Sequence, residues 1–149
     1  MCSERVRADD RYMTASHVVL MRHEALELLR RHDVGRLCVV DGEYPIAVPV
    51  NYRLHQDGAN QVVVIQTAPT ATVARATGNA SLEVDDIDLA AGAAWSVIAR
   101  GVLKRAHGDH GLPSTDPVVT ADRDQWLTLD IVAVSGRRFH VPPRTTPAI

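Results

Sequence analysis

The sequence predicts a mainly β protein with short helices, folded as a small antiparallel barrel. Hydrophobic residues make up 46% of the 149 residues but aromatic residues only 4%, so the core must consist of Val, Leu, Ile and Ala. Short runs rich in Val favour strands, and Gly, Asp and Asn separate these runs at turn positions. The long runs carry bends, which suit a closed barrel better than a flat sheet.

The N-terminal third predicts an arm, one helix and a hairpin. Residues 1–18 show no sustained hydrophobic period and are expected to form a flexible arm. The segment 22–33, RHEALELLRRHD, places its apolar residues on one side of a helix. Strands are expected at 35–41 and 45–55, joined by a tight turn at Gly42-Glu43.

Four further strands complete an expected total of six. They lie at 61–67, 80–86, 95–107 and 126–141, and a short helix is expected at 70–77 between the first two. Gly101 predicts a bend or bulge, and Ser135-Gly136 predicts a second bend. We expect a single domain over 19–141 and a disordered tail over 142–149.

Composition excludes several classes of function. The net charge of -2 and the mixed signs give no basic surface for nucleic acid. No apolar run is long enough to span a bilayer, and the polar N-terminus does not resemble a secretory signal. We therefore expect a cytoplasmic protein. Cys2 and Cys38 make no disulfide framework, and Cys38 is interpreted as a small core residue.

Acidic and histidine-containing segments do not predict a metal site. His107, Asp109 and His110 lack a third well-spaced ligand, and the acidic stretch DDID at 85–88 is interpreted as a solvated turn. The sequence contains neither a glycine-rich phosphate loop nor a nucleophile elbow. No side chain stands out as a general base, so no catalytic residue is assigned.

The stretch AVPVNY carries the first half of a candidate binding site. Pro49 cannot donate a ladder hydrogen bond, which would leave the backbone amides of Val50, Asn51 and Tyr52 free to face a ligand. Flat heterocycles need such donors along their edge of carbonyls and ring nitrogens. The alternative is that Pro49 only protects an edge strand. The residues alone leave both interpretations open.

The stretch QTAPTATVARATGN, which follows the third expected strand, carries the second half. Gln66 and Thr67 lead into a turn and a short helix, where a phosphate would meet the hydroxyls of Thr67, Thr70 and Thr72. The N–H groups at the start of that helix would add further donors. Alternatively, the threonines only cap the helix.

Several blocks together resemble the pyridoxamine 5'-phosphate oxidase-like flavoproteins of the actinobacterial type. These blocks are EALELLRRHDVGRLCVVDGEYPIAVPVNY, QTAP, EVDDID and WSVIARG, in this order. The resemblance implies an FMN-binding split β-barrel that forms a homodimer with two flavin sites at the interface. It implies isoalloxazine contacts at Pro49, Val50, Asn51 and Tyr52, ribityl-phosphate contacts at Gln66, Thr67 and the loop to Val73, and contacts from the partner subunit or the pocket wall by Trp95 and Ser96.

The phosphate loop departs from the family pattern at two positions. Similar proteins carry Arg or His before the threonine and Lys later in the loop, where this chain has Gln66 and Thr72. Each charge-assisted contact to a phosphate contributes about 1.5–3 kcal/mol. Loss of both would weaken FMN binding by about two to four orders of magnitude. Arg75, nearly one helical turn beyond Thr72, could replace one of the missing charges. Arg53 is a second candidate, but it is better interpreted as a solvated strand end.

The resemblance implies an FMN-dependent oxidoreductase that acts on an unidentified small molecule. The flavin would carry the hydride chemistry and the protein would supply orientation. One alternative is a split-barrel dimer without flavin that acts as a non-enzymatic binding protein. Two others are a haem protein and a reductase that uses a deazaflavin, whose acidic tail would need basic residues such as Arg75, Arg100, Lys104 and Arg105.

Overall fold

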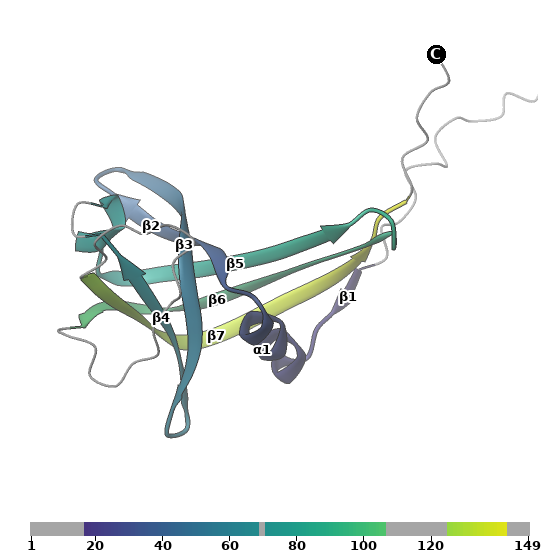
Figure 1. Cartoon of the computed structure of the whole chain (residues 1–149), viewed down its shortest axis with the longest axis horizontal. Helices are drawn as coiled ribbons and strands as arrows, with labels where there is room; N and C mark the ends of the chain where they lie inside the picture. The colour runs from purple at the N-terminus through teal and green to yellow at the C-terminus, as the bar shows by residue number, and fades with distance from the viewer. Residues whose placement is uncertain (1–16, 69–70, 107–124, 143–149) are drawn as a thin grey trace, which may run out of the picture.

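The protein is an almost all-β molecule in which long strands close into a ring (Figure 1). The structure, a computed structural model, describes residues 17–68, 71–106 and 125–142. The described elements are β1 (His17–Val19), α1 (Arg22–Arg31), β2 (Val34–Asp41), β3 (Tyr44–Asp57), β4 (Asn60–Thr67), the 3-10 helix η2 (Thr72–Arg75), β5 (Gly78–Asp88), β6 (Ala93–Ala106) and β7 (Gln125–His140).

The strand order confirms the predicted antiparallel barrel. The sheet runs β1-β7-β4-β3-β2-β5-β6, and an additional pairing of β6 with β7 closes the ring. Each predicted strand is present, and Gly42, with a φ of 63° that favours glycine, forms the tight turn between β2 and β3. The short strand β1 was not predicted. It pairs with the end of β7, so the sheet already begins at His17, inside the expected arm.

Beyond the ring, β5, β6 and β7 continue side by side as a three-stranded extension, to which β1 adds (Figure 1). The predicted irregularity at Gly101 is confirmed. The pairing of β6 with β7 shifts between Arg100 and Gly101, where Arg100 stands opposite Ala133 and Gly101 opposite Ile131. A Cβ atom at Gly101 would lie 1.9 Å from the carbonyl oxygen of Asp130. Only glycine permits this approach of the two backbones.

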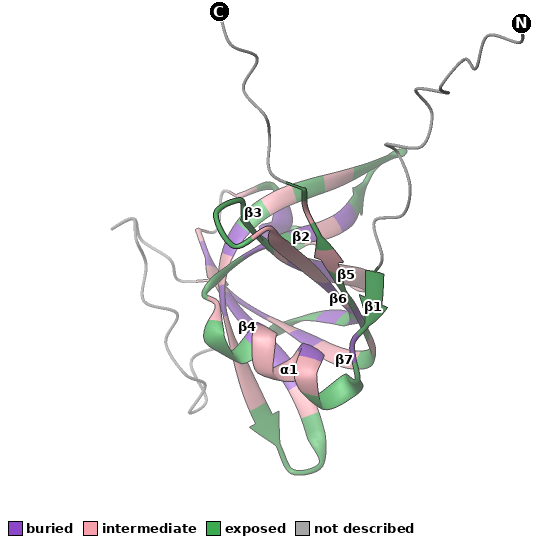
Figure 2. Cartoon of the chain, turned by 90° about the vertical axis from the view of Figure 1, so that its right-hand side faces the viewer, coloured by how far each residue is buried: buried purple, intermediate pink, exposed green. Residues whose placement is uncertain are grey.

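The core fills the ring with aliphatic side chains, as the composition requires. Alternate residues of each strand point inward, and the helix α1 lies across one opening of the ring (Figure 2). Ala25 and Leu29 are the buried residues of α1. At the start of the helix, Glu24 accepts a hydrogen bond of 2.8 Å from the backbone N–H of Met21, which satisfies one free donor.

The outer face of the barrel corrects one expectation. Cys38 is only half-buried and stands in register with Ser81 on β5, whereas its neighbours Leu37 and Val39 are buried in the core. The alternation of β2 therefore places Cys38 outside the barrel, and its interpretation as a core residue was wrong. Within the described residues, no helix is long and apolar enough to cross a membrane.

Candidate functional site

The candidate site centres on the place where β3 and β4 stop pairing, which we call the opening. The two strands pair from Asp57 and Asn60 up to Tyr52 and Ile65, and beyond this point β3 has no pairing with β4. On its other side β3 stays paired with β2 along its whole first half. If the register continued, Asn51 would stand opposite Gln66. The fold thus brings the two predicted halves of the site to the same opening.

The four residues predicted to contact the isoalloxazine ring lie on both faces of β3. Val50 and Tyr52 are buried in the core, whereas Pro49 is exposed and Asn51 is half-buried on the outer face. Backbone groups of alternate residues point to opposite sides of a strand. The N–H of Tyr52 donates to the carbonyl oxygen of Asp33 at 2.8 Å. The prediction of a free amide at Tyr52 was therefore wrong, and by the same alternation the amide of Val50 points to the side of β2. Pro49 and the backbone amide of Asn51 face the opening.

Tyr52 connects the opening to the helix α1. Its hydroxyl donates a hydrogen bond of 2.7 Å to the carbonyl oxygen of Leu29, in the last turn of the helix. Burial raises the pKa of Tyr52 well above its usual value, the charge of Asp33 raises it further, and Arg53 lowers it. The side chain of Tyr52 therefore stays neutral and acts as a support of β3.

The predicted phosphate loop keeps few side chains at the surface. Thr67 is 8% exposed and Val73 1% exposed, so both point into the protein and could offer a ligand only backbone groups. Gln66 is half-buried and Thr72 is exposed. Thr70 lies outside the described residues. The predicted helix at 70–77 is a single four-residue 3-10 turn, which corrects its expected length.

The two arginines expected to replace missing charges occupy different surroundings. Arg53 forms an ion pair with Asp33. Arg75 and Thr72 line a small hollow of about 120 Å³ together with the end of β2, including Asp41. This hollow adjoins β2, whereas Gln66 belongs to β4. Arg75 is thus close to Thr72, where the resemblance implies a lysine, and Gln66 is not among the described residues that line this hollow.

Trp95 and Ser96 point to opposite faces of β6. The ring of Trp95 packs edge-on against His32 at the end of α1, with ring centres 4.7 Å apart. Ser96 lies on the outer face, in a hollow shared by β6 and β7. One pocket of a single chain cannot receive both side chains.

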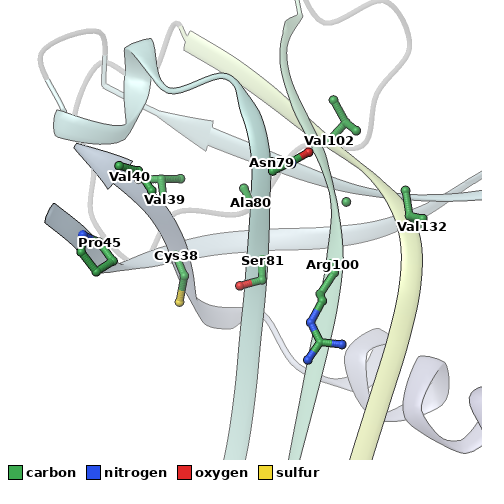
Figure 3. A pocket seen from close by; sticks show the side chains of 11 residues that line it. Cys38, Val39, Val40, Pro45, Asn79, Ala80, Ser81, Arg100, Val102 and Val132 are labelled. Atoms are coloured by element: carbon green, nitrogen blue, oxygen red, sulfur yellow. The ribbon is translucent and has the colours of Figure 1, made fainter. Parts of the chain in front are cut away.

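A hollow that sequence reasoning missed lies on the outer face of β2, β5 and β6 (Figure 3). It has a volume of about 480 Å³. Exposed apolar side chains rim it, among them Val40, Val102 and Val132 at 67%, 36% and 74% exposure. On β6, the outward Val102 between the buried Gly101 and Leu103 was one available signal. Arg100 extends from the edge of this hollow, away from Val102 (Figure 3).

Lys104 and Arg105, which were expected to contribute to a basic groove, both form interactions within the protein. Lys104 pairs with Asp130, and Nε of Arg105 donates to the carbonyl oxygen of Ala74 at 3.1 Å. Further along the sheet, Arg36 binds Asp85 and Glu83 at 2.7 and 2.6 Å. These two carboxylates raise the pKa of Arg36, Asp85 contributing most.

The acidic residues at the end of β5 stabilise the turn that follows it. The carboxylate of Asp86 accepts from the N–H of Ile87, and that of Asp88 accepts from the N–H groups of Ala90 and Ala91. The described residues contain no group of three or more His, Cys, Asp or Glu that could hold a metal ion. His107, Asp109 and His110 lie outside the described residues.

Solved structures of bacterial proteins share this fold. An FAD-binding protein from Mycobacterium smegmatis aligns with 84% of this chain and 100% of its own, at 24% identity and a TM-score of 0.63. A candidate pyridoxamine 5'-phosphate oxidase from Corynebacterium glutamicum aligns with 89% and 99%, at 20% identity and a TM-score of 0.72. An FAD-binding protein from Mesorhizobium loti aligns with 82% and 96%, at 21% identity and a TM-score of 0.58.

The sequence itself carries the family signature across the described barrel. No curated protein matches the chain. A family model described as pyridoxamine 5'-phosphate oxidase, however, matches residues 21–138. This range begins just before α1 and includes the opening, the phosphate loop and nearly all of β7. The chain belongs to the pyridoxamine 5'-phosphate oxidase family.

Proposed function

We propose that this protein is a flavin-dependent oxidoreductase that holds FMN at the opening between β3 and β4. The observation that carries the proposal is that β3 pairs with β2 at Pro49 and Asn51 but has no pairing there on the side of β4, whose end carries Gln66. The backbone N–H of Asn51 would donate a hydrogen bond to the edge of the isoalloxazine ring. The flavin would supply the hydride chemistry, and the substrate is a small molecule.

The choice among flavins rests on the phosphate end. Thr72 and the backbone of η2 would receive the phosphate, with Arg75 beside Thr72 as the nearest cation of that hollow. FAD is a direct competitor of FMN in this proposal, because two structural neighbours are FAD-binding proteins. A deazaflavin is the third candidate, and its acidic tail would need cations beyond Arg75.

The test is a titration of the purified protein with FMN, FAD and the deazaflavin, followed by flavin fluorescence and visible absorption. Saturable binding that weakens about tenfold or more in Asn51→Asp is expected, because the new carboxylate would repel the carbonyl-rich edge of the ring. Gln56→Glu is the matched control, since it places the same charge on the exposed end of β3. Equal binding by both variants would refute the placement at the opening.

Arg75→Ala tests the phosphate end separately. If Arg75 contacts the phosphate, its removal should weaken FMN about tenfold while riboflavin, which has no phosphate, binds as before. A parallel loss for FMN and riboflavin would instead indicate disturbance of η2. Unchanged FMN binding would remove Arg75 from the site.

We also propose that the apolar hollow on the outer face packs against a second copy of this chain. Val40, Val102 and Val132 expose apolar surface around it, and such patches mark protein interfaces. Val132→Glu should convert the dimer to a monomer in light scattering, whereas Leu89→Glu in the β5–β6 turn should not. A wild-type monomer would refute the proposal.

A second candidate function follows from the same dimer without a flavin. Gln66 and Thr72 carry no charge where similar proteins carry cations, which favours a weak or lost flavin site. The protein would then be a non-enzymatic binding protein. A colourless dimer that binds none of the three flavins would support this candidate and remove the oxidoreductase.

A further inference from the structure

A second hollow on the outer face of β6 and β7 has the character of an anion site. Its volume is about 300 Å³, and it lies between Ser96, Ile98 and Arg100 of β6 and the segment from Ser135 to Phe139 of β7. Two arginines, Arg100 and Arg137, and two serine hydroxyls line it. None of the described residues that line it carries a carboxylate.

The strand register places these groups on one face. Ser96 stands directly opposite Arg137, and Ile98 stands opposite Ser135. Arg100 follows two residues after Ile98 on the same strand, so its side chain shares their face. Cross-strand neighbours on one face lie about 4.5–5.5 Å apart at Cβ. Both arginines can therefore reach a ligand held above Ile98 and Ser135.

Arg100 extends toward this hollow from one end. Figure 3 shows its side chain running along the strands, away from Val102. Since Ile98 and Ser96 precede it on β6, the guanidinium points toward them, and it lines the hollow. Arg137 approaches from the opposite end, next to Ser96.

The charge on these arginines is not balanced as it is elsewhere on the sheet. Arg36 binds two carboxylates and Lys104 binds Asp130. Within the part of the chain that the structure describes, neither Arg100 nor Arg137 forms an ion pair. Asp85 and Glu83 of β5 stand opposite Ser96 and Ile98, and both carboxylates bind Arg36. Two guanidinium groups without an ion pair beside serine hydroxyls attract an oxyanion, because arginine binds phosphate and carboxylate groups through paired N–H donors.

We propose that Arg100, Arg137, Ser96 and Ser135 form a binding site for an oxyanion, the phosphate or carboxylate group of a small molecule. The site lies outside the opening between β3 and β4, and of its four residues only Ser96 is also among the flavin contacts that the resemblance implies. Its volume is at the small end of the range for small-molecule sites, which suits a phosphate or a compact carboxylic acid.

The experiment titrates the full chain with inorganic phosphate and, separately, with citrate, by calorimetry and thermal unfolding at constant ionic strength. We expect saturable binding of at least one of them, and the tighter ligand identifies the anion class. Arg100→Gln and Arg137→Gln should each weaken it about tenfold, and the double variant should abolish it. Ser135→Ala should weaken it by a smaller factor without changing any charge.

Arg138→Gln is the matched control, because Arg138 is the next residue of β7 and its side chain points to the other face. It removes the same charge and should bind the anion as the wild type does. Circular dichroism without ligand confirms that each variant is folded. Binding that is equal in Arg137→Gln and Arg138→Gln, or absent for both anions, would overturn the proposal.

Discussion

Restoring one missing cation to the phosphate loop should increase flavin affinity. Thr72 is exposed at the first position of η2 and lines a hollow beside Arg75. The resemblance described in the sequence analysis implies a lysine at this position. Thr72→Lys therefore adds an ammonium group at the surface, without burying charge or removing a core contact.

The magnitude follows from the exposure of the site. A charge-assisted hydrogen bond to a phosphate contributes about 1.5–3 kcal/mol when well formed. Because the new lysine would be flexible and solvated, the lower value applies, and the dissociation constant of FMN should fall about tenfold. Asp41 lines the same hollow, so part of the added charge would be neutralised there. The gain should shrink with added salt.

The assay is a fluorescence titration of FMN and riboflavin with wild type, Thr72→Lys and Thr77→Lys. Thr77 is exposed just after the hollow, so Thr77→Lys supplies the same charge away from the proposed phosphate position. Only Thr72→Lys should bind FMN more tightly, and riboflavin should bind equally to all three proteins. An equal gain in both variants would indicate general attraction.

The reasoning would be refuted if Thr72→Lys bound FMN no better than wild type while remaining folded. The phosphate would then lie elsewhere, and the weakness of the loop could not be attributed to the charge missing at Thr72. A gain for riboflavin as large as that for FMN would refute the assignment equally, since riboflavin has no phosphate.

Two further predictions concern the barrel itself. Gly101→Ala should lower the free energy of unfolding by at least about 3 kcal/mol in urea denaturation, because its Cβ would lie 1.9 Å from the carbonyl oxygen of Asp130; an unchanged midpoint would contradict the bulge geometry. Tyr52→Phe should cost about 1–3 kcal/mol, since the buried hydroxyl donates to Leu29. The raised pKa of Tyr52 makes its contribution complete below pH about 10, where unfolded tyrosine titrates. That contribution is lost as the pH rises toward the folded pKa, so Tyr52→Phe should flatten the alkaline fall in stability.

The sequence by itself determined the strands and their order along the chain. Alternation and Val-rich runs locate each long strand, because a strand with one face in the core must repeat with a period of two. Gly101 was recognised as an irregularity because a strand interior rarely tolerates glycine. β1 was missed, since its three residues are too few to show any period and are all exposed.

The sequence also located the two halves of the candidate site, but it did not decide which groups are free. Pro49 and Gln66 were identified from local chemistry. The position of Tyr52 in the core was decided by the register of β3 against β2 and by the contact with Leu29. Those contacts join residues distant in the chain, so local pattern could not reveal them.

Only the tertiary structure decided how the faces of the barrel are used. Trp95 and Ser96 are neighbours in sequence but point to opposite faces of β6. Arg100 and Arg137 are remote in sequence, and the pairing of β6 with β7 brings them to one hollow. Closure of the ring fixes which side of each strand is inside, and that choice separates the core of this protein from its outer faces.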